Sequence, residues 1–384
     1  MKTIKLFAMF CATVVLLNSC LTGVGTDEDM NAPVKPQIPA KGELELTATP
    51  TTIVADGEEF SKLRLTKGGV EITSDFKLYD GSNKEVELPD MKFVTTKKGE
   101  YEFWASYGTD VTETITITAT EKKPDAPSAP GDDNPDKVNF KRRVLLIQFT
   151  GTGCGYCPGM TTTLREIMAE PYYDENVILV AAHRYNTGDP AYLYGAALDQ
   201  AMGVSSYPQV AVDMHTRTGY TNYGSVTSMI LTAIERVEAR AGIAATSEYD
   251  EETRTVSITA TVKAAETKEF RIGAWLIEDG IYAKQTNNGY PGNFDIHDHC
   301  IRVADSKVTG SDFSGHALGE IEAGSTAQYS FSIKIDKEWK AENCRLVLFV
   351  SSPEKNNYGK SYFYVNNTVE MPLEGTIDYE YLDE

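Results

Sequence analysis

Two cysteines with two residues between them stand in the segment FTGTGCGYCPGM, where Cys154 and Cys157 are followed at once by Pro158. Three kinds of chemistry use this spacing: thiol–disulfide exchange, an inert structural disulfide, and metal binding. Exchange needs one sulfur that attacks as a thiolate and a second, nearby sulfur that resolves the mixed disulfide. Cys154 is therefore the candidate nucleophile and Cys157 the candidate resolving thiol.

Metal binding is the weakest of these alternatives. A zinc site needs about four ligands, whereas the chain has one such cysteine pair, and the nearest histidine, His183, lies at no matching spacing. Haem attachment requires a histidine directly after the second cysteine, where Pro158 stands. His297 and His299 are expected on the same face of one strand, a spacing that could bind a metal. The neighbouring Asp295 and Asp298 favour a solvated face instead. We predict no metal and no cofactor.

The elements around the pair follow from the hydrophobic pattern. Residues 144–147, VLLI, form a continuous apolar run, which predicts a strand buried on both faces. A helix should follow, because Met160, Leu164, Ile167 and Met168 fall on one stripe. Cys157 then begins the helix and Cys154 closes the preceding loop. The partial positive charge of a helix N-terminus favours an exposed, low-pKa thiolate at Cys154.

The region of residues 138–242 continues this alternation of strands and helices. Further buried strands are expected at 177–182 and 209–212, and helices around 191–202 and 225–240. This order is typical of an α/β layer fold with parallel strands.

The regions on either side, residues 43–121 and 243–384, alternate apolar and polar residues with period two. Each predicts a β-sandwich. In the first, KKGEYEF resembles the tyrosine corner of immunoglobulin domains, with Tyr101 as the tyrosine. Residues 122–137 contain four prolines and predict an extended linker. The fold class is therefore multidomain α+β, with an Ig-like sandwich, a central α/β domain and a C-terminal sandwich.

The first 20 residues indicate export. A basic start is followed by an apolar run, Leu6 to Leu17, that is too short to span a bilayer permanently. The run ends in LNSC, which resembles a bacterial lipobox and implies a signal peptide over residues 1–20 and lipidation of Cys20. The alternative is a plain secretory signal with a chance cysteine. Residues 21–42 lack periodicity and predict a tether.

The charge excludes one class of partner. The chain has 56 acidic and 36 basic side chains and a net charge of −20. Such a surface repels phosphate backbones, so we expect no nucleic acid partner.

Cysteine parity suggests a second bridge. Four cysteines remain once Cys11 leaves with the signal and Cys20 is lipidated, and an even number in an exported protein suggests two pairs. The second would join Cys300 to Cys344. Two buried free thiols, or a second-site substrate for the first pair, are the alternatives.

The central segments together resemble the thioredoxin superfamily. Strand, C-x-x-C, helix and then the segment GVSSYPQVAV (203–212) follow its layout, in which Pro208 matches the cis-proline. The resemblance implies a substrate cradle at Tyr207 and Pro208, together with Gly155 and Tyr156, the dipeptide also found in the periplasmic disulfide isomerase. Gln148 stands where the superfamily has a buried acid, and Gly153 where it has a tryptophan.

The whole order of segments, over roughly residues 139–384, resembles the 28-kilodalton outer-membrane-protein family of Bacteroidetes. The implied function is that of a lipid-anchored outer-membrane or cell-surface protein, which exchanges thiols and disulfides with exported proteins. The membrane would be its second partner, through Cys20. The alternative is a non-enzymatic surface binding or adhesion lipoprotein whose C-x-x-C is only structural.

Overall fold

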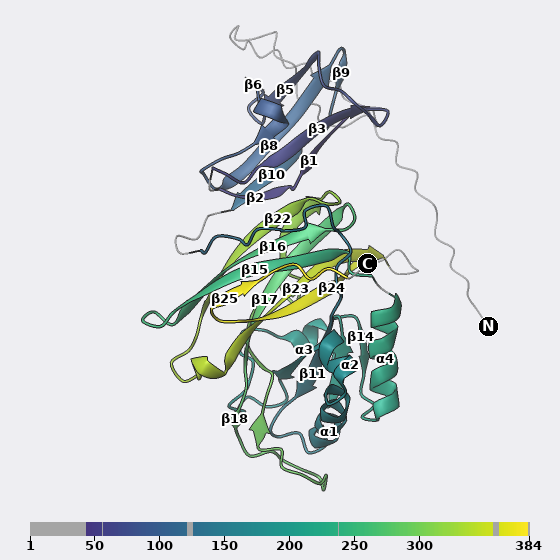
Figure 1. Ribbon diagram of the computed structural model, residues 1–384, viewed down its shortest axis with the longest axis vertical. Coiled ribbons are helices and arrows are strands. Elements are labelled where there is room, and N and C mark those ends of the chain that lie inside the picture. The colour runs from purple at the N-terminus through teal and green to yellow at the C-terminus, as the bar shows by residue number, and fades with distance from the viewer. Residues whose placement is uncertain (1–43, 56, 121–125, 237, 356–360, 383–384) are drawn as a thin grey trace, which may run out of the picture.

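The computed structural model describes residues 44–55, 57–120, 126–236, 238–355 and 361–382. The expected signal peptide, Cys20 and the tether lie outside these residues. Within them the protein is mostly β, with several sheets and few helices (Figure 1). Figure 1 shows the N-terminal strands at one end of the long axis and the α-helices at the other end. In the described part of the chain, no helix is long and apolar enough to cross a membrane.

Two sheets form the N-terminal body. The first has the order β1-β3-β4, with β7 beside β3, and the second has the order β2-β10-β8-β5-β6, with β9 beside β8. Alternate residues of these strands, such as Leu63 and Leu65, turn into a shared core. The elements are β1 (Leu44–Thr49), β2 (Thr52–Val54), β3 (Ser61–Lys67), β4 (Val70–Glu71), β5 (Phe76–Asp80), β6 (Glu85–Val86), η1 (Pro89–Met91), β7 (Lys92–Phe93), β8 (Gly99–Tyr107), β9 (Asp110–Val111) and β10 (Ile115–Thr120).

The middle of the chain alternates strands and helices, but the helix expected around 191–202 is reduced to the four residues of α3, and the helix expected over 225–240 ends at Arg236. Strand β11 is buried along its whole length, and helices α1 and α4 pack on one of its faces. β11 pairs parallel with β12 but antiparallel with β13, so the expectation of parallel strands throughout is wrong for β13. The elements are β11 (Val144–Thr150), α1 (Cys157–Met168), α2 (Pro171–Asn176), β12 (Val177–His183), α3 (Leu198–Ala201), β13 (Gln209–Val212), β14 (Thr216–Thr218) and α4 (Tyr223–Arg236).

Whereas β18 and β19 pair only with each other, strands β17, β20, β21, β23 and β24 extend the same sheet. Its order is β14-β13-β11-β12-β20-β17-β23-β24, with β21 beside β17, and the join is the parallel pair of Ala181 and Cys300. A second sheet, β22-β16-β15-β25, shares a large apolar core with it. The elements are β15 (Ala241–Asp250), β16 (Thr255–Ala264), β17 (Lys268–Glu278), β18 (Ile281–Tyr282), β19 (Ile296–His297), β20 (Cys300–Asp305), β21 (His316–Ile321), β22 (Thr326–Lys334), η2 (Ala341–Asn343), β23 (Cys344–Lys355), β24 (Ser361–Pro372) and β25 (Gly375–Ile377).

The sheet therefore runs across residue 242, where the sequence pattern suggested that one domain ends and the next begins. The physical reason lies in β12, which is buried along its whole length. Its second edge needs a backbone partner, and β20 supplies one.

Part of the expected linker is fixed to the body of the protein. The ammonium group of Lys263 is buried and donates to the carboxylate of Asp132 at 2.7 Å and to the carbonyl of Pro135 at 2.7 Å. The hydroxyl of Tyr381 lies 3.1 Å from the same ammonium. A buried cation requires such partners, so this stretch is held in place instead of standing free.

Candidate functional site

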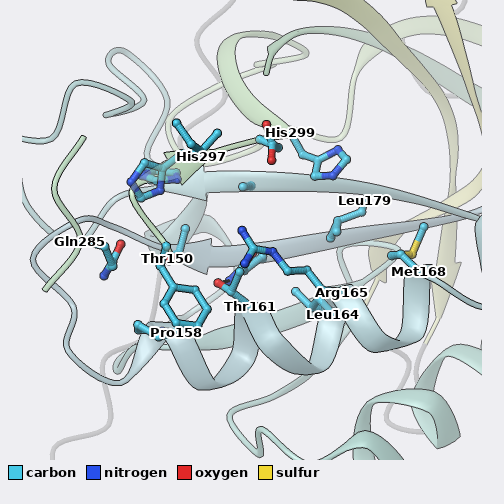
Figure 2. A pocket seen from close by; sticks show the side chains of 16 residues that line it. Thr150, Pro158, Thr161, Leu164, Arg165, Met168, Leu179, Gln285, His297 and His299 are labelled. Atoms are coloured by element: carbon cyan, nitrogen blue, oxygen red, sulfur yellow. Dashed lines mark hydrogen bonds between the residues drawn. The ribbon is translucent and has the colours of Figure 1, made fainter. Parts of the chain in front are cut away.

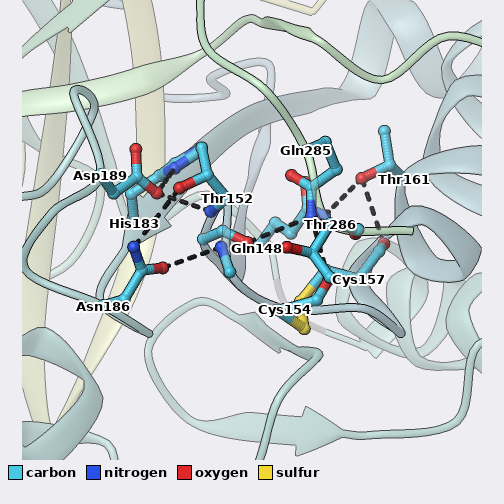
Figure 3. Close-up of a disulfide and its surroundings, with 12 residues drawn as sticks. Gln148, Thr152, Cys154, Cys157, Thr161, His183, Asn186, Asp189, Gln285 and Thr286 are labelled. Carbon is cyan, nitrogen blue, oxygen red and sulfur yellow. Dashed lines mark hydrogen bonds and ion pairs between the residues drawn. A yellow bond between two sulfur atoms is a disulfide. The ribbon is translucent and has the colours of Figure 1, made fainter. Parts of the chain in front are cut away.

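Cys154 and Cys157 form a disulfide at the junction of β11 and α1 (Figure 3). The S–S distance is 2.02 Å and the Cα atoms are 5.4 Å apart. Cys157 is the first residue of α1. Cys154 lies in the preceding turn, and its backbone N–H donates to the carbonyl of Gly151 at 3.0 Å. The predicted position of the pair, between a buried strand and a helix N-terminus, is confirmed.

The expectation of an exposed attacking sulfur is wrong for this oxidised state. Cys154 is 2% exposed and Cys157 is 1% exposed, whereas Tyr156 between them is 63% exposed. Two other segments of the chain bind the backbone of the cysteine loop.

The first supporting segment follows β12. The carboxylate of Asp189 accepts the backbone N–H of Thr152 at 2.7 Å and lies 2.7 Å from Nδ1 of His183. Asn186 accepts the N–H of Gly153 at 2.9 Å. Burial alone would raise the pKa of Asp189, but the bonds from His183 and the backbone amides outweigh burial and lower it to about 2.

The second supporting segment, residues 285–290, comes from the loop between β18 and β19, and we call it the brace. The side-chain amide of Gln285 donates to the carbonyls of Cys154 at 2.9 Å and Gly151 at 3.3 Å. Backbone N–H groups of Thr286 and Asn288 donate to the carbonyls of Thr152 at 2.8 Å and Gly155 at 3.0 Å. Figure 3 shows Gln285 and Thr286 on the side of the loop away from the sulfur atoms.

The brace fits because Gly155 in the cysteine loop and Gly159 in the first turn of α1 have no side chain. A Cβ at Gly155 would lie 2.5 Å from the side chain of Asn288, and one at Gly159 would lie 2.7 Å from the ring of Tyr290. Sequence reasoning did not assign any role to the brace. The two glycines were the available signal, because each marks a place where another part of the chain approaches closely.

The predicted cis bond between Tyr207 and Pro208 is present. Phe149 of β11 pairs with Gln209 of β13, so Pro208 lies beside the end of β11, where the cysteine loop begins. The Tyr207 hydroxyl donates to Asp199 at 3.0 Å, and burial followed by the Asp199 charge raises its pKa. The tertiary structure therefore brings the four residues of the expected cradle to the same end of the sheet as the disulfide.

Gln148 stands where a buried acid was expected from the resemblance. Its side-chain amide donates to the Thr161 hydroxyl at 3.0 Å. It lines a cavity of about 120 Å³ between α1 and the β19–β20 segment (Figure 2). Three histidines line this cavity as well: His183, His297 and His299. Among the described residues no group of three or more His, Cys, Asp or Glu side chains is arranged to hold a metal ion.

The expected alternation of His297 and His299 on one solvated strand face is wrong. His297 ends β19 and is buried, and its ring lies 3.1 Å from the carbonyl of Ala283. His299 lies between strands with a φ of 61°. Burial lowers the pKa of both rings. The second cause is the charge of His183 for His297 and the charge of Arg345 for His299.

The predicted bridge between Cys300 and Cys344 is wrong, because both cysteines are free. Each pairs in register with Glu278, from opposite sides, so strand β17 separates them. Cys300 is buried with its sulfur 3.6 Å from Nε2 of His183. Burial raises the pKa of Cys300 well above its ordinary value, and burial followed by the Glu278 charge raises that of Cys344 to about 12.

Comparison with known proteins bears on the fold and the family. HBP35 of Porphyromonas gingivalis has a similar structure, with a TM-score of 0.50 and 21% identity over 62% of this chain and 77% of that chain. A domain of the outer membrane lipoprotein Omp28 from Porphyromonas gingivalis is 18% identical over 35% of this chain and 89% of that chain, with a TM-score of 0.22. No curated protein matches this chain.

A family model described as "Outer membrane protein Omp28" matches residues 195–364. The match includes Pro208 and most of the C-terminal strands, and it begins after Cys157. It covers less of the chain than the predicted likeness over residues 139–384. Over residues 195–364, this chain is therefore similar to the family of outer membrane proteins that the Omp28 model describes.

Proposed function

We propose that this outer membrane protein exchanges thiols and disulfides with exported polypeptides, with Cys154 as the nucleophile and Cys157 as the resolving thiol. One observation carries the proposal. The Cys154–Cys157 disulfide lies at the N-terminus of α1, and the Tyr207–Pro208 segment lies at the same end of the sheet. This arrangement supports exchange, because a client chain that pairs with the backbone at Tyr207 would lie beside the cysteine pair.

In the reducing direction, the Cys154 thiolate attacks one sulfur of a client disulfide. A mixed disulfide forms, and the other client sulfur leaves as a thiolate. The Cys157 thiolate then attacks the Cys154 sulfur, releases the second client thiolate and closes the disulfide seen here. Two electrons pass to the client, and the reverse sequence oxidises it. The positive end of α1 stabilises the thiolates.

Burial of both sulfurs adds a condition to this chemistry. Because Cys154 and Cys157 are almost fully covered when oxidised, a client reaches them only when the surrounding loop moves. The brace and the Asp189 segment hold that loop through several hydrogen bonds, so they set how readily it moves.

The same proposal covers the finer architecture. Residues 138–242 form a thioredoxin-like part, and the N-terminal body is Ig-like. The latter is supported by Tyr101, whose hydroxyl donates to the carbonyl of Lys97 at 2.8 Å, as in a tyrosine corner. Lipidation of Cys20, which lies outside the described residues, would hold the protein at the membrane, and the LNSC segment supports it.

The second candidate function is a non-enzymatic surface binding or adhesion protein with a structural disulfide. The burial of both sulfurs favours it. The reduction potential separates the two functions: a value between about −120 and −230 mV fits an exchange catalyst, and a value below about −300 mV fits a structural bridge. Reduction of a protein disulfide by the wild type, with Cys154→Ser as the inactive control, completes the test. A structural potential together with no turnover would contradict the proposed exchange.

A further inference from the structure

Four tyrosines gather at the end of the mixed sheet that holds the disulfide. Tyr156 follows β11, Tyr185 follows β12, Tyr207 precedes β13 and Tyr220 follows β14. Thr150 pairs with His183, Phe149 with Gln209, and Val210 with Thr218 in the registers of these strands. The registers bring the four chain segments to one edge. We call these residues the tyrosine rim.

The rim is exposed and partly held in place. Tyr156, Tyr185 and Tyr220 are 63%, 50% and 72% exposed. The Tyr185 ring stands edge-on to the Tyr207 ring with centroids 5.4 Å apart. The Tyr185 side chain also lies so close to Gly151 that a Cβ there would meet the Tyr185 Cβ at 2.7 Å. Aromatic side chains fixed in this way offer a binding surface at low entropic cost.

The rim is bordered by an open strand edge. β14 is the last strand of the sheet, and no described strand pairs with its outer side. Its residues Thr216 and Arg217 are exposed. An extended polypeptide can add to such an edge through backbone hydrogen bonds. The rim crosses three strand spacings from β12 to β14, or about 14 Å, and ends at Tyr220 beside this edge.

The charge of the protein indicates what such a segment carries. A net charge of −20 draws basic segments and repels acidic ones. Tyrosine faces bind Lys and Arg through cation–π contacts and bind aromatic rings edge-to-face. A cation–π contact of this kind is present beside Tyr185, where the Arg184 guanidinium lies 4.7 Å from the centroid of the Tyr192 ring.

We propose that the tyrosine rim and the β14 edge bind an extended, basic and aromatic segment of an unfolded exported polypeptide. The bound segment would bring the polypeptide's cysteines to Cys154. This inference rests on the proposed function, since it names the part of the client that the same site recognises. Tyr185 and Tyr220 are then residues that determine specificity.

The test uses the full chain and two probes of one sequence, an eight-residue peptide that alternates lysine and tryptophan. The first probe has no cysteine and carries a fluorophore, so its binding is read by anisotropy. The second carries a mixed disulfide and reports exchange, which is compared with exchange on a small aromatic disulfide. The variants are the double substitution Tyr185→Ala with Tyr220→Ala, and the ring-preserving pair Tyr185→Phe with Tyr220→Phe.

Tyr172→Ala is the matched control. Tyr172 is an exposed tyrosine on α2, which precedes β12 and therefore lies at the other end of that strand. We expect the double alanine variant to bind the cysteine-free peptide about tenfold more weakly, and to lose about tenfold in the ratio of peptide to small-disulfide exchange rates. The phenylalanine pair should restore binding, and Tyr172→Ala should bind as the wild type does.

The outcomes separate this inference from the proposed function. If the peptide binds through the tyrosines but no exchange occurs, the proposed exchange function is wrong and the proposed binding surface is supported. If the protein catalyses exchange but does not bind the peptide, the proposal that the tyrosine rim binds clients is wrong. It is also wrong if the double alanine variant binds the peptide as well as the wild type does. A loss of binding that Tyr172→Ala matches would overturn it too. Circular dichroism and thermal unfolding of each variant verify that it is folded.

Discussion

The carboxylate of Asp189 accepts the backbone N–H of Thr152 at a distance of 2.7 Å, two residues before the disulfide. The same oxygen lies 2.7 Å from the ring of His183. One buried carboxylate therefore ties the loop after β12 to the loop that carries Cys154. Because Asp189 is ionised, the attachment depends on pH.

Acid should weaken this attachment. The pKa of Asp189 is lowered from 3.8 to about 2 in the folded protein. A lowered folded-state pKa contributes stability above pH 3.8, and that contribution disappears as the pH falls towards 2. Asp189→Asn should lose about 2 kcal/mol of unfolding free energy at pH 6 and less at pH 2.5. Urea unfolding at both values measures it. Asp133→Asn, which alters an exposed carboxylate, is the control, and an equal loss for Asp189→Asn at both pH values would contradict the prediction.

Removing the brace contact should make the disulfide easier to reach. Gln285→Ala leaves the carbonyls of Cys154 and Gly151 without their amide donor, and unmatched buried acceptors cost about 1–3 kcal/mol. The loop should then open more often, and reduction by a small phosphine should accelerate about tenfold, measured by quenched alkylation and mass spectrometry. Gln200→Ala, an exposed glutamine on α3, should reduce at the wild-type rate. A Gln285→Ala variant that reduces no faster than Gln200→Ala would show that the brace does not control access.

Lys263 should be essential for attaching the linker. Lys263→Met removes the buried ammonium, so the Asp132 carboxylate loses its cation and keeps only the Tyr381 hydroxyl and the Asn134 N–H, and two carbonyls lose their donor. Breaking a buried ion pair in this way costs about 3–5 kcal/mol, which chemical denaturation would detect. Lys284→Met removes an ammonium that pairs with Asp295 at the surface, and it should change stability by less than about 1 kcal/mol. Similar losses for the two variants would refute a special role for Lys263.

The two cysteines of the C-terminal strands should be reduced in the native protein. Alkylation after denaturation without reductant should modify Cys300 and Cys344, and peptide mapping should find Cys154 linked to Cys157. In the native state at pH 8 both thiols should react slowly, because burial raises the pKa of Cys344 to about 12 and raises the pKa of Cys300 well above its ordinary value. Recovery of a linked Cys300–Cys344 peptide would contradict the structure.

Membrane attachment should depend on one cysteine. Cys20→Ala should move the protein from the membrane fraction to the soluble fraction, because the LNSC segment then has no thiol to carry lipid. Immunoblots of the fractions after a high-salt wash measure this. Cys11→Ala, inside the apolar run, should leave the distribution unchanged. A Cys20→Ala protein that stays with membranes after the wash would rule out a lipid anchor at this residue.

The sequence alone determined the local features of the site. A continuous apolar run predicted β11, helical periodicity predicted α1, and the cysteine spacing placed Cys154 and Cys157 between them. These features depend on neighbours within a few residues, so the pattern of side chains decides them. The cis bond before Pro208 was expected from a resemblance, which carries positional information that periodicity lacks.

Only the tertiary structure decided which distant segments meet. The brace reaches the cysteine loop from more than 120 residues later in the chain, and β20 joins β12 across the expected domain boundary. Cys300 and Cys344 have suitable parity for a bridge, yet β17 pairs between them. Strand order and direction follow from which edges and apolar faces find partners over the whole fold, and no local pattern specifies that choice.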